Sequence, residues 1–123
     1  MRNLGVFLPQ TLSVGDLANL GLSLGGIAIG ASTQQFGESP EAAYLDLATE
    51  LSNGCFDDDE FRQLQSQLGF TPEAYLSIHM SSTKAAFDRA LGIARVIRER
   101  WGGAIDYSGA GGKIDEPFTP PPP

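Results

Sequence analysis

The stretch 70–109 constrains the fold of this chain most, because its hydrophobic period changes from two to about 3.6 and back. Residues 75–80 alternate polar and apolar side chains, which predicts a strand with one buried face. Residues 83–101 repeat apolar side chains at intervals of three and four, which predicts a long amphipathic helix. Two glycines end that helix, and 104–107 predicts another strand. The stretch is therefore a strand, a helix and a strand.

The rest of the chain gives weaker patterns of the same two kinds. They predict a strand at 4–8, a helix over 13–24, a strand at 27–32, a loop at 33–40 and a helix over 57–68. Residues 43–51 fit a helix by the spacing of Tyr44, Leu47 and Leu51, and equally fit a strand that pairs with the preceding one. We favour the strand.

These elements predict an α+β fold with one domain. A chain of 123 residues with 41% hydrophobic and 19% charged residues is long and apolar enough to bury one core. We expect residues 1–113 to form a mainly antiparallel sheet of about five strands with about three helices packed on a face. The proline-rich residues 114–123 are expected to be a disordered tail, with docking to an aromatic groove as the alternative.

Charge is the main functional signal. Fifteen acidic and eight basic residues give a net charge of -7, which disfavours nucleic acid and favours basic protein surfaces. Four consecutive acids, Asp57, Asp58, Asp59 and Glu60, stand at the start of a predicted helix. They are either a solvated helix start favoured by the helix dipole, or a partner-binding patch. Glu38 and Glu41 extend such a patch if the fold brings them near.

The sequence contains no catalytic, metal or cofactor motif. The single histidine, His79, and the single cysteine, Cys55, have no spacing that predicts a nucleophile and its base. One histidine and one cysteine cannot form a structural zinc site, and the four acids lack the spacing of a calcium loop. We therefore expect no enzyme activity, no metal and no cofactor.

The chain is expected to be cytoplasmic. No secretory signal is visible at the first residues, and the longest apolar stretch is shorter than the roughly 20 residues that span a bilayer. A lone cysteine fits a reducing compartment, because it cannot form an intramolecular disulfide.

The block QLGFTPEAYLSIHMSSTKAAFDRALGIARVIRERWGGAIDYSG, together with the opening LGVFLP, resembles small bacterial immunity-type proteins of polymorphic toxin systems. The resemblance rests on the turn with Gly69, Phe70 and Pro72, on the alanine- and leucine-rich helix ending in GG, and on the final short strand. It implies a non-enzymatic protein that neutralises a cognate toxin or effector by binding at or near the toxin's active site. An adaptor or chaperone domain for a secreted effector is the alternative.

Overall fold

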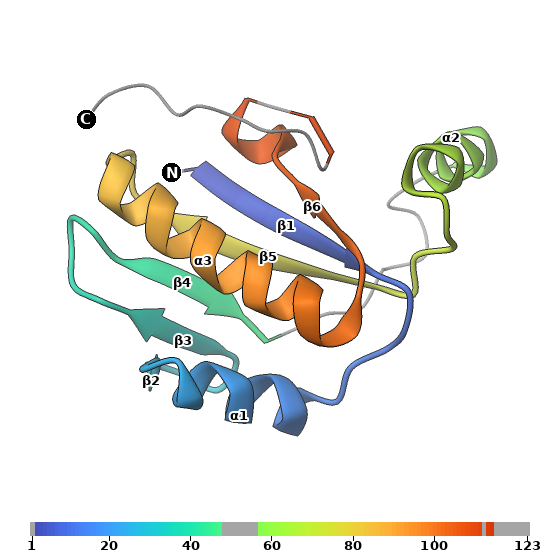
Figure 1. Ribbon diagram of the computed structural model, residues 1–123. Helices are drawn as coiled ribbons and strands as arrows, with labels where there is room; N and C mark the ends of the chain where they lie inside the picture. Colours follow the sequence, from blue (N-terminus) through green and yellow to red (C-terminus); the bar gives the residue numbers. More distant parts are fainter. Residues whose placement is uncertain (1, 48–56, 112, 115–123) are drawn as a thin grey trace.

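The strands of the protein form one open antiparallel sheet in the order β2-β3-β4-β5-β1-β6 (Figure 1). The computed structural model describes residues 2–47, 57–111 and 113–114. Its strands are β1 (Arg2–Leu8), β2 (Ile27–Ala28), β3 (Thr33–Phe36), β4 (Ala43–Asp46), β5 (Ala74–Met80) and β6 (Ala104–Asp106). Its helices are α1 (Val14–Ser23), α2 (Asp58–Leu68), α3 (Lys84–Trp101) and the short 3-10 helix η1 (Ser108–Ala110).

The core lies between the sheet and α3. In β5 every second side chain is buried, and the register Leu4↔Ile78 and Val6↔Leu76 puts the apolar residues of β1 on the same face. The side of α3 that faces the sheet carries small side chains, because alanines recur every fourth residue. The helix can therefore approach the sheet closely. The buried residues of α3 are Ala86, Phe87, Ala90, Ile93, Ala94 and Ile97.

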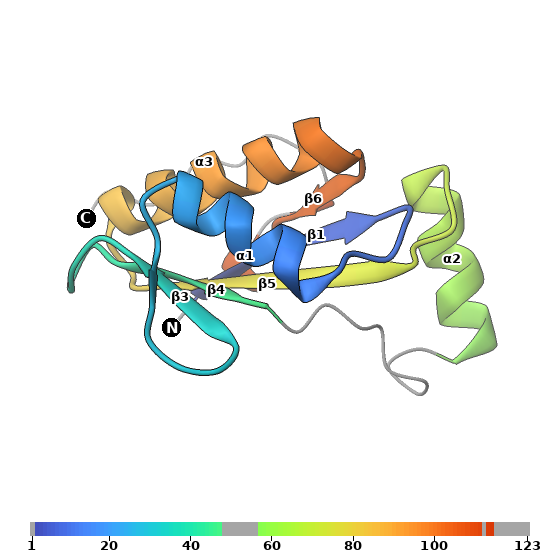
Figure 2. The same cartoon turned by 90° about the horizontal axis from the view of Figure 1, so that it is seen from below.

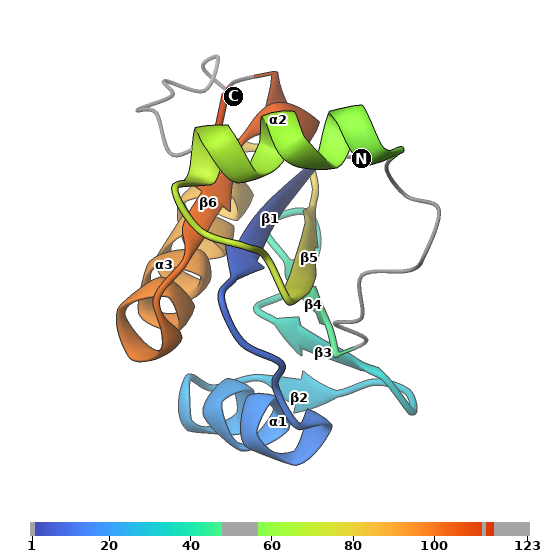
Figure 3. The same ribbon diagram turned by 90° about the vertical axis from the view of Figure 1, so that its right-hand side faces the viewer.

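Helices α1 and α3 both cover this face of the sheet, as Figure 2 shows. Leu17 of α1 is fully buried in the core, and the buried Gln34 of β3 donates a 2.9 Å hydrogen bond to the Ala18 carbonyl of α1. Helix α2 is placed differently from the expectation of three helices packed on one face. It crosses the end of the sheet (Figure 3), and none of its residues belongs to the main core.

The α+β fold and the antiparallel sheet agree with the sequence, with six strands in place of about five. The strand in the ambiguous segment is confirmed at Ala43–Asp46, and the helix over 57–68 is confirmed as α2. The expected strand at 27–32 is only Ile27–Ala28. The expected loop at 33–40 is wrong in its first half, which is β3. The polar residues of this segment favoured a loop, but Gln34 is buried, and its side-chain amide is bonded to the Ala18 carbonyl of α1.

Three sequence expectations fall outside the described residues. They concern Cys55, the end of the ambiguous segment beyond Leu47, and the tail from Asp115 onward.

Candidate partner-binding surface

The four consecutive acids form the exposed start of α2. Asp57 is the N-cap residue, and its Oδ1 accepts a 2.7 Å hydrogen bond from the backbone N–H of Glu60. Glu60 Oε1 accepts a longer 3.5 Å bond from the N–H of Asp57, which completes a capping box. Two of the four carboxylates, those of Asp57 and Glu60, thus stabilise the start of α2.

Asp58 and Asp59 have no role in the capping box. Asp59 lies 3.8 Å from Arg62, with both side chains largely exposed, so water screens the pair and its contribution to stability is small. Asp58 and Asp59 are therefore the carboxylates of this patch that a partner can contact at the smallest cost to the helix.

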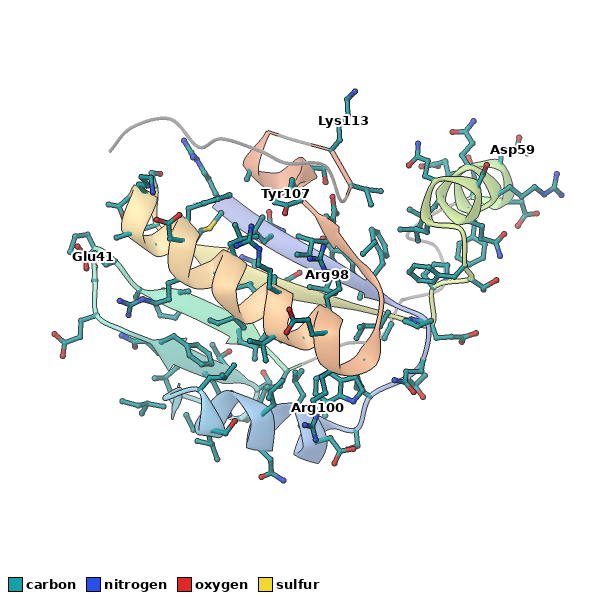
Figure 4. All side chains as sticks on the ribbon, in the orientation of Figure 1. Glu41, Asp59, Arg98, Arg100, Tyr107 and Lys113 are labelled. Carbon is teal, nitrogen blue, oxygen red and sulfur yellow. The ribbon has the colours of Figure 1, made fainter. Side chains whose placement is uncertain are left out.

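Glu38 and Glu41 do not join that patch. They lie in the turn between β3 and β4, where the N–H of Glu41 donates to the Glu38 carbonyl over 2.8 Å. The hydroxyls of Ser81 and Thr83 both donate to the Pro40 carbonyl, which ties this turn to the start of α3. Figure 4 shows Glu41 and Asp59 at opposite ends of the molecule. The predicted acidic residues therefore form two separate surfaces.

A second surface is the face of the sheet opposite α1 and α3. Neither α1 nor α3 lies on it (Figure 2), although η1 lies against Asn3 at one end and both Phe7 and Asp106 are buried. The strand registers place on this face Asn3, Phe7, Thr33, Gln35, Tyr44, Asp46, Tyr75, Ser77, His79 and Asp106. His79 is exposed and lies directly across from Asn3 on β1 and Tyr44 on β4. Tyrosine is enriched at protein interfaces, and the partly exposed Tyr44 beside the exposed His79 gives this face residues that a partner could contact.

Tyr75 is the most constrained side chain of this face. Its ring packs on Phe7 at 4.6 Å between centroids, and its hydroxyl donates a 3.0 Å hydrogen bond to Asp106 Oδ2. Asp106 Oδ1 accepts a second bond, of 2.9 Å, from the Ser108 N–H. Burial, and then the charge and hydrogen bond of Asp106, raise the pKa of the Tyr75 hydroxyl well above its ordinary value. Tyr75 is therefore a hydrogen-bond donor at neutral pH.

The described residues contain no group of three or more His, Cys, Asp or Glu side chains placed to hold a metal ion. No helix in this part of the chain has the length and apolarity that crossing a membrane requires. Comparisons with protein families, with curated proteins and with solved structures return no match for this chain.

The sequence did not identify the residues of this exposed sheet face, although one signal for them was present. The alternation over 75–80 already separates a buried row from a semi-polar row. The matching rows of β3 and β4 could not be assigned, because the first was expected to be a loop and the second was ambiguous.

Proposed function

We propose that this protein is a non-enzymatic immunity protein, which binds a cognate bacterial toxin or effector and occludes its active site. The observation that carries the proposal is the exposed acidic start of α2, which lies outside the main core. A negative surface on a protein of net charge -7 speeds encounter with a basic partner. Asp58 and Asp59 are the preferred electrostatic contacts, with Asp57 and Glu60 holding the helix start in shape.

In the immunity-type families that the sequence resembles, the cognate toxin is commonly encoded by a neighbouring gene. Binding to the product of the adjacent gene therefore tests the proposal, by calorimetric titration and by association rates at low and high salt. The informative variant is Asp58→Asn with Asp59→Asn, because it leaves the capping box of Asp57 and Glu60 intact. The matched control is Glu38→Gln with Glu41→Gln, at the opposite end of the molecule. Each variant removes two negative charges, so both change the net charge from -7 to -5.

The α2 variant is expected to associate at least about threefold more slowly at low salt, and the control variant much less so. The difference is expected to vanish near 1 M salt, where the Debye length is about 3 Å. Equal slowing of both variants would show that only net charge matters. No binding at micromolar concentration would remove the proposal.

The uncovered sheet face favours a second candidate, an adaptor or chaperone domain that holds a secreted effector. Such a domain would use Tyr44 and His79, which lie across from each other on this face. Replacing both by alanine is expected to weaken an effector held by the sheet, and to leave an association directed by Asp58 and Asp59 largely unchanged. Titration of the same adjacent-gene product with this variant separates the two candidates.

A further inference from the structure

A groove of about 470 Å³ lies on the helix-covered side of the molecule, bordered by α1, β3 and α3. Its volume falls in the range of about 300–1,000 Å³ that is usual for small-molecule sites. Phe36 and Ile93 are buried core residues at its base, and Leu24 at the end of α1 is 40% exposed. The lining residues are Leu24, Gly25, Phe36, Gly37, Asp88, Arg89, Gly92, Ile93 and Val96. The lining is thus mainly apolar, with one acid and one base.

Gly92 keeps this groove open. It is an exposed residue in the interior of α3, where glycine is a poor helix former. A Cβ added at Gly92 would meet no atom within 4 Å, so no neighbouring element requires a glycine there. The missing side chain leaves space in the groove and is explained by nothing else in the described fold.

Arg89 supplies an unused positive charge. Its guanidinium lies against Gly37, where any side chain would overlap it. Within the part of the chain that the structure describes, the guanidinium of Arg89 has no hydrogen-bond or ion-pair partner. The acid of the groove is already engaged, because Asp88 forms a 2.7 Å ion pair with Lys84. The charge left for a ligand is therefore positive.

We propose that this groove binds a free medium-chain carboxylate. The alkyl chain packs on Phe36, Ile93 and Val96, and the carboxylate accepts paired hydrogen bonds from the Arg89 guanidinium, whose planar fork matches a carboxylate. The proposal does not rest on the immunity function, since the groove lies on α3 and neither acidic surface lines it.

Octanoate is the probe, titrated into the full chain and followed by amide chemical shifts. Saturable shifts are expected for Gly25, Gly37 and Gly92, which all line the groove. Three matched probes serve as controls. Octanol lacks the negative charge, octylamine carries a positive charge in its place, and acetate lacks the alkyl chain. Octanol and octylamine are expected to bind at least about tenfold more weakly, because a hydrogen bond to a charged group is worth about a factor of ten or more. Acetate is also expected to bind more weakly, because it has no alkyl chain to bury.

Two variants locate the binding. Arg89→Gln is expected to weaken octanoate at least about tenfold, whereas Arg95→Gln, an exposed arginine of α3 that does not line the groove, is expected to change nothing. Gly92→Leu is expected to block binding with the fold intact, because its side chain enters open space. Equal binding of octanol or octylamine, or unchanged octanoate affinity in Arg89→Gln and Gly92→Leu, would overturn the proposal.

Discussion

At the residue scale, Gly5 shows how one missing side chain arranges a group of others. A Cβ at Gly5 would overlap the hydroxyl and ring of Tyr75. Tyr75 therefore lies across β1 and reaches Asp106 on the far side of that strand, because β1 pairs with both β5 and β6. The Tyr75–Asp106 bond links two strands that do not pair with each other.

Removing the Tyr75 hydroxyl tests that link. Tyr75→Phe is expected to lower the free energy of unfolding by about 1–2 kcal/mol at pH 7, because Asp106 loses a hydrogen bond in a largely buried site. Urea denaturation measures the loss. The control is Tyr44→Phe, whose hydroxyl has no hydrogen bond among the described residues. It is expected to change stability by less than about 0.5 kcal/mol.

The stability difference between the parent protein and Tyr75→Phe is also expected to depend on pH. The folded-state pKa of Tyr75 is raised above its unfolded value of about 10. The stabilising effect of the protonated hydroxyl is therefore complete below about pH 10, and it is lost as pH rises toward the folded-state pKa. The stability difference between the parent protein and Tyr75→Phe is expected to narrow above pH 10. A constant difference from pH 7 to pH 11 would contradict this assignment.

At the element scale, α3 is the helix on which the core depends. Thr83 caps it by accepting a 3.1 Å hydrogen bond from the Ala86 N–H, and Gly102 and Gly103 end it with positive φ angles of 80° and 118°. Gly103 has no freedom to change, because a Cβ there would overlap the Phe7 carbonyl oxygen of β1. Gly92, in the middle of the helix, has no such restriction.

Replacement by alanine is expected to have opposite effects on stability at Gly92 and at Gly103. Gly92→Ala should raise the free energy of unfolding by about 0.5–1 kcal/mol, because alanine is the better helix former and open space receives its Cβ. Gly103→Ala should lower it by about 2 kcal/mol or more, through the backbone clash and the positive φ. Chemical denaturation of both variants checks the signs. A loss of stability in Gly92→Ala would mean that α3 needs this glycine for packing.

At the scale of the whole molecule, stability is expected to be uneven. The sheet, α1 and α3 share one continuous core, whereas α2 supplies no residue to it. Segments outside a shared core open locally at a lower free energy than global unfolding. The acidic start of α2 therefore belongs to a segment that can adjust to a partner while the rest of the fold stays intact.

Cap removal on the two helices tests this division. Asp57→Ala removes a cap worth about 1 kcal/mol, and it is expected to speed amide exchange in α2 about fivefold with no change in β1 and β5. Thr83→Ala removes the corresponding cap of α3 and is expected to lower global stability, which urea denaturation reads directly. Equal protection of α2 and the core strands in the parent protein would show that α2 unfolds with the core.

The sequence alone determined the elements whose apolar period is strong and whose ends carry caps. Strand β5, helix α3, strand β6 and the capped start of α2 could be predicted because local spacing and terminal residues specify them. Strand β3 could not, because the burial of Gln34 depends on the Ala18 carbonyl of α1, a partner distant in sequence. The relative positions of the acidic residues could not be predicted either, for the same reason. Residues 57–60 were identified as a cluster, but only the tertiary structure placed Glu38 and Glu41 at the other end of the sheet. Local order is a property of neighbouring residues, whereas a surface or groove is a property of segments that meet only in the folded chain.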